Sequence, residues 1–333
     1  MTDESEQHAY VVGVDLSDSW VNAAVIDDSG HVLVRSLARV DVGEHPSDLL
    51  GKTVAKAVED AVERSGRTPT VLGLSMPGTL RPEEGLCLLS PRLGWEDVPV
   101  VEILEKALPL RAVVVNDIRS ILAGERAYGA GRSVENFVCV SMGSVVDGGI
   151  MLNGRVYEGA SDCAGEIGHL TIEQEGSECA CGNQGCLDTL VSGPAVARMV
   201  CEAIRLGAQS VMSEWASEEM PLTSEMVCRA AREGDALALK VWDKVGRYLG
   251  LGLAAVVTIV NPRRIIIGGR LAQAFDFFAP TLREEVRRRA RMVPRDYTEI
   301  VPSPLGLDAA LLGCGVVALR AQLTATSGSL RET

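Results

Sequence analysis

A short cysteine-rich segment constrains the fold of this chain more than any other feature of its sequence. One imidazole and three thiols stand close enough in the chain to bind one ion: His169, Cys179, Cys181 and Cys186. This ligand set is typical of a tetrahedral structural zinc site, which leaves no position for water. Gly182 and Gly185 supply the backbone freedom that a short loop needs to fold around a metal. The segment predicts a bound Zn²⁺ that holds a loop and takes no part in chemistry.

Ordinary buried cysteines beside a chance histidine are the alternative. Only three of the nine cysteines share this spacing, which favours the metal site. The other six are scattered, at positions 87, 139, 163, 201, 228 and 314. Unpaired thiols of this kind suit a reducing compartment, so we expect a cytoplasmic protein. The acidic start of the chain also lacks the basic and apolar regions of a signal peptide.

The residues before the cysteines place a carboxylate beside the metal ligand. Glu166 stands three positions before His169, so both side chains leave the same face of a helical turn. A metal ion that fixes His169 therefore also orients Glu166.

Two motifs here resemble a known family. GASDCAGEIGH, residues 159–169, and CACGNQGCLD, residues 179–188, are similar to the signature of the ROK family, which comprises repressors, open reading frames and kinases. Its kinases phosphorylate hexoses and N-acetylated amino sugars. The likeness extends from Val11 to about Leu319. It implies an α/β fold of two lobes, the actin-like fold of sugar kinases and Hsp70-type ATPases, with a central cleft.

The order of elements along the chain indicates an internal duplication. Residues 11–34 and 137–157 each show a strand, a Gly, Ser or Asp turn, and a second strand. We expect a smaller lobe from residues 1–118 and 306–333 and a larger lobe from residues 119–305, with a hinge near 117–129. Further patterns predict helices over 46–64, 192–207, 249–260 and 307–322, and a strand over 264–267.

Composition and charge exclude several classes of partner. The formal net charge is −13 and aromatic residues make up 4%, so we expect no nucleic-acid binding. About ten residues precede the first strand, too few for the winged-helix segment of the family's repressors. The six arginines of Arg283 to Arg295 predict a solvated helix face partly paired with Glu284 and Glu285. The apolar run Leu249 to Val260 is too short to span a membrane.

A buried strand predicts the position of the reactive carboxylate. Three valines, 113–115, precede Asn116 and Asp117, and ligands of open α/β sheets bind at strand ends. Asp117 is our candidate general base, because a carboxylate can accept the proton of an attacking sugar hydroxyl. By resemblance, Asn116, Glu166, His169 and Asp188 bind the sugar hydroxyls. A plain turn at Asn116–Asp117 and a helix cap at Asp188 remain the alternatives.

Two further loops resemble sugar-binding elements of the family. Residues 73–79 contain Pro77 and Gly78, whose turn lets the backbone approach a sugar, and residues 90–95 form the second loop. Arg92 and Arg119 stand where the family usually carries asparagines. Two arginines favour a substrate that carries an acid or phosphate, or else both point to solvent.

The nucleotide loops depart further from the family pattern. Where its kinases have Asp-x-Gly-Gly-Thr-Lys, this chain has residues 15–20, with Asp15 and Ser17 as candidate contacts and Asp18 as an added negative charge. The second loop contains Gly143 and Ser144. Val145 replaces a glycine and Asp147 adds a carboxylate. The remaining candidates, Gly268 and Gly269, match the family's adenosine element.

Two functions are therefore compatible with the sequence. One is an ATP-dependent sugar kinase in which Mg²⁺ offsets the added carboxylates at positions 15, 18 or 147. The other is a pseudokinase that senses a sugar without phosphoryl transfer. The chain retains the carboxylates of the sugar site, Asp117, Glu166 and Asp188, and this slightly favours the kinase. The family's habit suggests a homodimer or tetramer.

Overall fold

The computed structural model describes residues 8–41, 43–215, 221–294 and 296–329, and these divide into two compact units. Unit 1 comprises Met1–Arg132 and Asp308–Thr333, and unit 2 comprises Ser133–Leu307. Helix α4 (Asp117–Ala127) belongs to unit 1 because it packs along helix α10 (Ala309–Ser329). Unit 1 therefore extends to residue 132, beyond the boundary at residue 118 that was expected from the sequence.

Unit 1 is built on a five-stranded sheet with strand order β3-β2-β1-β4-β8. Its strands are β1 (Tyr10–Leu16), β2 (Trp20–Asp27), β3 (Val32–Arg39), β4 (Val71–Met76) and β8 (Arg111–Asn116). The first three strands are antiparallel, whereas β4 and β8 run parallel to β1. The helices before α4 are α1 (Pro46–Asp48), α2 (Ala55–Ser65) and α3 (Val100–Ala107), with a π-helical turn over Leu49–Val54.

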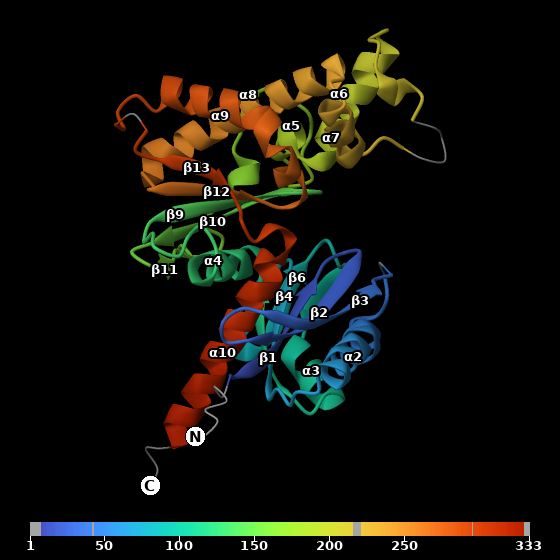
Figure 1. The fold of residues 1–333 in the computed structure, drawn as a ribbon, viewed down its shortest axis with the longest axis vertical. Helices are drawn as coiled ribbons and strands as arrows, with labels where there is room; N and C mark the ends of the chain where they lie inside the picture. Colours follow the sequence, from blue (N-terminus) through green and yellow to red (C-terminus); the bar gives the residue numbers. More distant parts are fainter. Residues whose placement is uncertain (1–7, 42, 216–220, 295, 330–333) are drawn as a thin grey trace, which may run out of the picture. The chain divides into compact units, whose positions relative to one another are not determined.

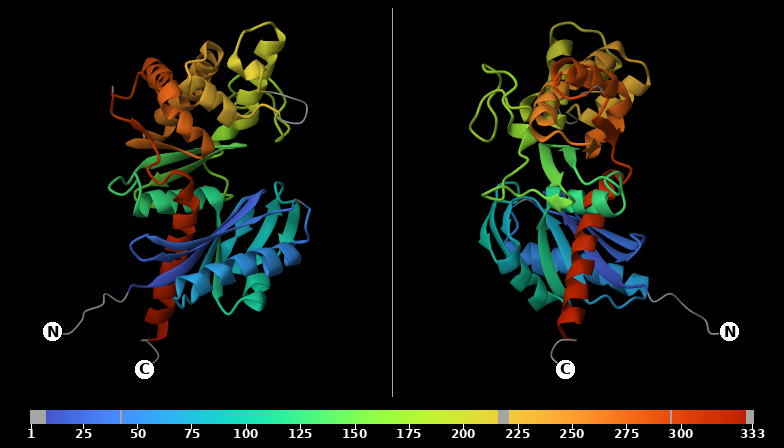
Figure 2. Two further views of the ribbon diagram at one scale, coloured as in Figure 1. Left: turned by 45° about the vertical axis from the view of Figure 1, so that its right-hand side comes forward. Right: turned by 90° about the vertical axis from the view of Figure 1, so that its left-hand side faces the viewer.

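Helices cover both faces of this sheet. Helices α2 and α3 pack on one face, and α10 lies along β1 and β4 on the other (Figures 1 and 2). Glycine permits the close contact between α10 and α4, because a Cβ at Gly313 would lie 1.7 Å from the carbonyl oxygen of Ser120. A second, three-stranded sheet consists of β5 (Thr79–Arg81), β6 (Leu86–Ser90) and β7 (Trp95–Val98). Its loops carry Pro77, Gly78 and Arg92.

Unit 2 contains a second five-stranded sheet, with strand order β11-β10-β9-β12-β13. Its strands are β9 (Phe137–Met142), β10 (Val146–Leu152), β11 (Arg155–Val156), β12 (Arg264–Gly268) and β13 (Glu299–Pro302). Its helices are α5 (Asp188–Val191), α6 (Gly193–Arg205), α7 (Ser224–Arg232), α8 (Ala236–Val260) and α9 (Phe275–Arg289). Buried Val138, Ile265, Trp242 and Phe278 belong to the core cluster that joins this sheet to its helices.

The two sheets confirm the internal duplication. Each combines an antiparallel hairpin, β1-β2 or β9-β10, with parallel strands on the other side of its first strand. The predicted helices and the strand near 264 are also present. Short 3-10 helices complete the fold: η2 (Pro82–Glu84), η3 (Ile167–His169), η4 (Val211–Ser213), η5 (Arg270–Ala274) and η6 (Gly306–Asp308).

Helix α10 forms most of a long apolar segment among the described residues. By length and composition alone, Gly306–Thr324 is able to cross a membrane, with a mean hydropathy of 1.4. Half of that segment is buried, and α10 contacts β1, β4 and α4. These contacts are those of a core helix. The apolar run at 249–260 forms the end of α8.

The arginine-rich segment forms an exposed helix end, as predicted. Arg288 and Arg289 both donate to Glu285 within α9, at 2.7 and 2.9 Å. Arg287 pairs with Asp296. Arg295 lies outside the described residues. Of the two predicted partners, Glu285 forms these ion pairs, and Asp296 is a partner that was not predicted.

Candidate functional site

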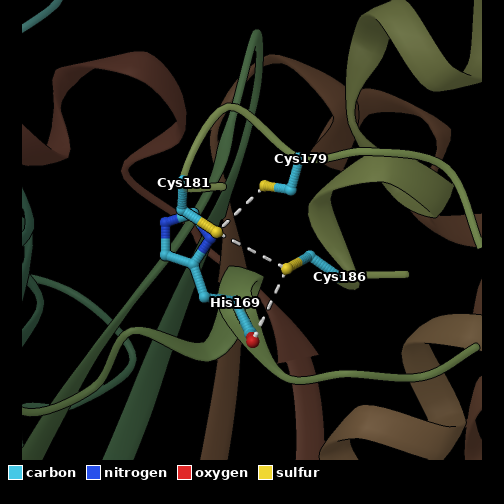
Figure 3. A group of neighbouring side chains, drawn as sticks. All are labelled: His169, Cys179, Cys181 and Cys186. Carbon is cyan, nitrogen blue, oxygen red and sulfur yellow. Dashed lines mark hydrogen bonds between the residues drawn. The ribbon is translucent and has the colours of Figure 1, made fainter. Parts of the chain in front are cut away.

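The four predicted metal ligands meet at one point of unit 2. Their ligand atoms all lie within 4.8 Å of one another, and Figure 3 shows the side chains turned toward a common centre. The Sγ atoms of Cys181 and Cys186 are 3.8 Å apart, and Cys179 Sγ lies 3.6 Å from His169 Nδ1. Zn–S bonds of about 2.3 Å and a Zn–N bond of about 2.0 Å give tetrahedral edges of about 3.8 and 3.5 Å. The residues therefore fit a tetrahedral zinc ion.

Backbone hydrogen bonds fold the loop that carries these cysteines. The N–H of Cys179 donates to Asn183 O at 2.7 Å, and the N–H of Gly182 donates to Cys179 O at 2.9 Å. Gly185 adopts φ +68°, and a Cβ there would lie 1.5 Å from Glu173 O. The loop therefore requires glycine at 185 for both its backbone conformation and its close packing.

Two glycine substitutions separate the effect of backbone strain from the effect of a steric collision. Gly182 has φ +88° with no atom within 4 Å of an added Cβ, so Gly182→Ala is expected to cost only about 1–2 kcal/mol of backbone strain. Gly185→Ala adds the collision with Glu173, and we expect it to lose most of its bound zinc. Zinc content by atomic emission and the melting temperature by calorimetry test this difference. Equal zinc loss in the two variants would contradict it.

Glu166 and His169, two of the proposed sugar ligands of unit 2, lie beside each other. Glu166 precedes helix η3, and its Oε2 lies 3.9 Å from His169 Nε2. Because Nδ1 faces the cysteines, Nε2 is the ring nitrogen on the side of the carboxylate. Both side chains are about half exposed, at 57% for Glu166 and 43% for His169. The predicted proximity of Glu166 to the metal ligand is thus present.

Asp188 has a structural partner that the sequence did not reveal. Its Oδ1 accepts the N–H of Val146 at 2.6 Å, which ties the start of α5 to strand β10. It does not cap its own helix, so the helix-cap alternative is wrong. Burial raises the pKa of Asp188, while the Val146 N–H and the charge of His169 act in the opposite direction.

Strand β8 delivers Asn116 and Asp117 to one end of the sheet of unit 1. Asn116 is the N-cap of α4, and its Oδ1 accepts the N–H groups of Ile118 and Arg119 at 3.1 and 3.3 Å. Its Nδ2 donates to Gly78 O at 3.1 Å. Three predicted site residues are therefore brought together, and Asn116 caps a helix instead of forming the plain turn that was the alternative.

Asp117 has the electrostatic properties of a weakly basic carboxylate. Burial raises its pKa to about 6, against the opposing effects of the Arg92 cation and the Ile118 N–H, and the nearby Asp15 raises it further. Burial likewise raises the pKa of Asp15 to about 6. Such values leave Asp117 mostly ionised at pH 7 and close to the range in which general bases work well.

Arg92 and Asp18, both departures from the family pattern, contact each other. Arg92 Nη2 donates to Asp18 Oδ2 at 3.3 Å, and Arg92 Nη1 lies 3.7 Å from Asp117 Oδ2. The Arg92 side chain is 30% exposed, so the idea that it points to solvent is wrong. The repulsion expected from Asp18 is offset within the chain. Arg119 is partly buried on α4.

The first candidate nucleotide loop, residues 15–20, forms hydrogen bonds within its own turn. Ser17 Oγ accepts the N–H groups of Ser19 and Trp20 at 3.3 and 3.0 Å and donates to Trp20 O at 3.1 Å. The N–H of Ser17 donates to Trp20 O at 2.9 Å. Several backbone donors that a nucleotide phosphate would need are therefore already used within the turn.

The second loop keeps part of its predicted geometry. The N–H of Gly143 donates to Val145 O, and Gly143 O accepts the N–H of Gly193 at the start of α6. Val145 does not have a positive φ, so the strain expected from its side chain does not arise. Ser144 lies in the same turn. This loop therefore lies beside the N-terminus of α6, and a helix N-terminus is a favourable neighbour for a phosphate.

The adenosine element keeps its close backbone packing. Gly268 ends β12, and Gly269 follows with φ +79°. A Cβ at Gly269 would lie 2.4 Å from Met142 O. Glycine is therefore required at this position, where β12 passes beside β9.

Comparison with known proteins gives this geometry a context. The ROK family model matches residues 11–321. A glucokinase of Halalkalibacterium halodurans is 30% identical over 316 residues, covering 92% of this chain and 94% of that protein. A xylose repressor of Caldicellulosiruptor bescii is 28% identical over 307 residues, covering 91% of this chain and 76% of the repressor. Kinases and repressors thus both resemble the chain along most of its length.

Solved structures confirm the fold. A ROK family glucokinase from Streptomyces griseus, in complex with glucose and AMPPNP, aligns with a TM-score of 0.83 at 25% identity. The alignment covers 94% of this chain and 100% of that protein. The actin-like sugar-kinase fold expected from the sequence is therefore confirmed.

Proposed function

Because this chain belongs to the ROK family, we propose that it binds a hexose, amino sugar or related polyol and transfers a phosphoryl group from ATP to one of its hydroxyls. The observation that carries this proposal is the position of Asp117. Its carboxylate lies at the end of strand β8, directly after Asn116 and beside the Pro77–Gly78 loop that Asn116 holds. A sugar kinase needs such a carboxylate within reach of the acceptor hydroxyl.

Asp117 is assigned the role of general base. With its pKa raised to about 6, it is ionised at neutral pH and accepts the proton of the hydroxyl as the phosphoryl group arrives. We assign contacts with the other ring hydroxyls to Asn116, Glu166, His169 and Asp188. Amide, imidazole and carboxylate groups suit this role because a sugar hydroxyl both donates and accepts hydrogen bonds.

Bound Zn²⁺ is proposed to support the sugar contacts without taking part in the reaction. His169 Nδ1 and the three cysteine sulfurs would hold it, and His169 then keeps a fixed orientation beside Glu166. This role follows from the closed ligand set, which has no open position for a substrate.

We propose that the turns of both hairpins, β1-β2 and β9-β10, contribute contacts to the nucleotide. The candidate nucleotide contacts are backbone groups near Ser17 in unit 1 and, in unit 2, groups near Gly143, Ser144 and the Gly268–Gly269 turn. Mg²⁺ that enters with ATP would supply charge neutralisation of the phosphates, and Asp15 offers it a carboxylate oxygen. Because the hydrogen bonds of Ser17 already use the donors of the first loop, we expect weak nucleotide binding.

The pKa of Asp117 predicts a rate that depends on pH. A raised pKa means that the carboxyl gains its proton as the pH falls through about 6, and a protonated carboxyl cannot accept another. We expect kcat/KM for the sugar to be constant above that pH and to fall about tenfold per pH unit below it. Initial rates between pH 5 and pH 8 test this, and an unchanged rate at the acidic end would exclude Asp117 as the base.

Formation of ADP tests the proposed reaction. The zinc-loaded protein is mixed with Mg·ATP and single sugars from a panel of hexoses, N-acetylhexosamines and linear polyols. We expect ADP release that depends on one of these sugars, with a phosphorylated sugar identified by mass spectrometry. ADP release that is the same with and without every sugar would contradict sugar-kinase activity.

A second function has its own supporting observation. The closed turn at Ser17 and the contact of Asp18 with Arg92 favour a sugar sensor without phosphoryl transfer. Such a protein would bind its sugar but release no ADP. We further expect a cytoplasmic homodimer or tetramer, which light scattering after size exclusion would test.

A further inference from the structure

We propose that Asp18, Arg92 and Asp117 form a latch in unit 1, in which Arg92 covers the carboxylate oxygen that an acceptor hydroxyl has to reach. The inference rests on the proposed function, because it takes Asp117 as the base. The three side chains come from separate segments: the turn after β1, the loop between β6 and β7, and the first turn of α4. Arg92, in the β6–β7 loop, therefore contacts both the turn after β1 and the first turn of α4.

Both carboxylate oxygens of Asp117 already have partners. Oδ1 accepts the N–H of Ile118 at 2.9 Å, and this contact belongs to the fixed start of α4. Oδ2 faces the guanidinium of Arg92 at 3.7 Å. A hydroxyl that gives its proton to this carboxylate must approach within about 2.6–3.2 Å. Because the guanidinium faces Oδ2, we infer that a hydroxyl that approaches this oxygen displaces Arg92.

Asp18 anchors the other end of the guanidinium. Its Oδ2 accepts from Arg92 Nη2 at 3.3 Å, while its Oδ1 accepts from the hydroxyl of Ser19 at 2.8 Å. Side-chain exposures of 30% for Arg92 and 32% for Asp18 mean that neither group is freely hydrated. The guanidinium is attracted to both carboxylates, and partly buried charges are screened less by salt than exposed ones. Asp18 therefore keeps Arg92 in place.

The latched position leaves one donor of Arg92 without a partner. Its Nε is buried and makes no hydrogen bond. An unpaired buried donor is unfavourable, so this conformation is opposed by a cost that an alternative position of the side chain removes. The latch is thus held by Nη contacts alone and can be released by a ligand that competes for Asp117.

A closed latch lowers the apparent affinity for the sugar. When only the open fraction of the protein binds, the apparent dissociation constant rises by the inverse of that fraction. An open fraction of about 10% corresponds to about a tenfold loss of affinity. Removing the latch should therefore increase sugar affinity, which is the opposite of the effect of damaging a binding site.

Four variants test the latch. Arg92→Asn removes the guanidinium that faces Asp117, and Asp18→Asn removes only the carboxylate that holds this guanidinium. The variant with both substitutions completes a double-mutant cycle. Arg81→Asn is the matched control, because Arg81 pairs with Glu84 on the surface of the same sheet. The melting temperatures of the sugar-free proteins measure how much the Asp18–Arg92 contact stabilises the fold. Calorimetric titration with the sugar panel measures how the contact changes sugar affinity.

We expect the two substitutions to be non-additive in melting temperature, since both break one contact. We also expect Arg92→Asn to increase sugar affinity about tenfold, Asp18→Asn to increase it less, and Arg81→Asn to leave it unchanged. Additive melting temperatures, or an affinity that Arg92→Asn leaves unchanged or lowers, would overturn the latch. If non-additivity is found but no variant binds any sugar, the contact exists while the proposed function, and the gating role built on it, are both wrong.

Discussion

Replacing Asp117 with asparagine is expected to lower the rate of phosphoryl transfer about 10²–10⁴-fold without lowering sugar affinity. Asparagine keeps the shape of the side chain but cannot accept the hydroxyl proton. It can still accept a hydrogen bond from Ile118 N–H, so the first turn of α4 should remain intact. Steady-state rates of ADP formation and calorimetric titration with the sugar separate the two effects.

An exposed aspartate of the same unit provides the control. Asp60 on α2 pairs with Arg64 at the surface, so Asp60→Asn should keep full turnover. Turnover that survives in Asp117→Asn at the level of the control would show that another group takes the proton. Loss of both turnover and sugar affinity would instead give Asp117 a binding role.

Replacing Cys181 with serine is expected to release zinc and to weaken sugar binding about 10–100-fold in the same variant. Cys181 is exposed, so the substitution disturbs little packing apart from the loss of a metal ligand. Without the ion, His169 is no longer held, and Glu166 beside it loses its orientation. Zinc content by atomic emission and sugar affinity by calorimetry are measured on the same preparation.

Cys201→Ser is the matched control, because Cys201 is also exposed but lies on α6 outside the metal cluster. It should retain both zinc and sugar affinity. A zinc-free Cys181→Ser protein with unchanged sugar affinity would break the proposed coupling between the ion and the sugar ligands. Zinc retained at full occupancy would instead remove Cys181 from the ligand set.

The features that could be predicted from the sequence are those encoded locally. The metal cluster follows from the spacing of its cysteines and from the glycines between them, since a short loop can reach a metal in few ways. The hairpins of the two sheets follow from alternating apolar strands and turn residues. Asn116 and Asp117 follow from a run of valines that had to end at the edge of a sheet.

Contacts between distant segments could not be predicted in the same way. Arg92 and Asp18 are 74 positions apart, and their pairing depends on how the loop after β6 folds back toward the turn after β1. Asp188 and Val146 are 42 positions apart, and the sequence suggested only a sugar contact or a helix cap for that aspartate. The boundary of unit 1 depends on the packing of α4 against α10, two helices that are far apart in the sequence.

Calorimetric titration of the zinc-loaded protein with a panel of hexoses and N-acetylhexosamines, with and without Mg·ATP, shows whether the protein binds a sugar at all. We expect one sugar to bind with a Kd below about 1 mM, equivalent to about −4 kcal/mol, and Mg·ATP to bind more weakly than the sugar. Binding of the sugar alone would favour the sensor. No binding of any sugar, by a protein that retains its zinc, would rule out both proposed functions.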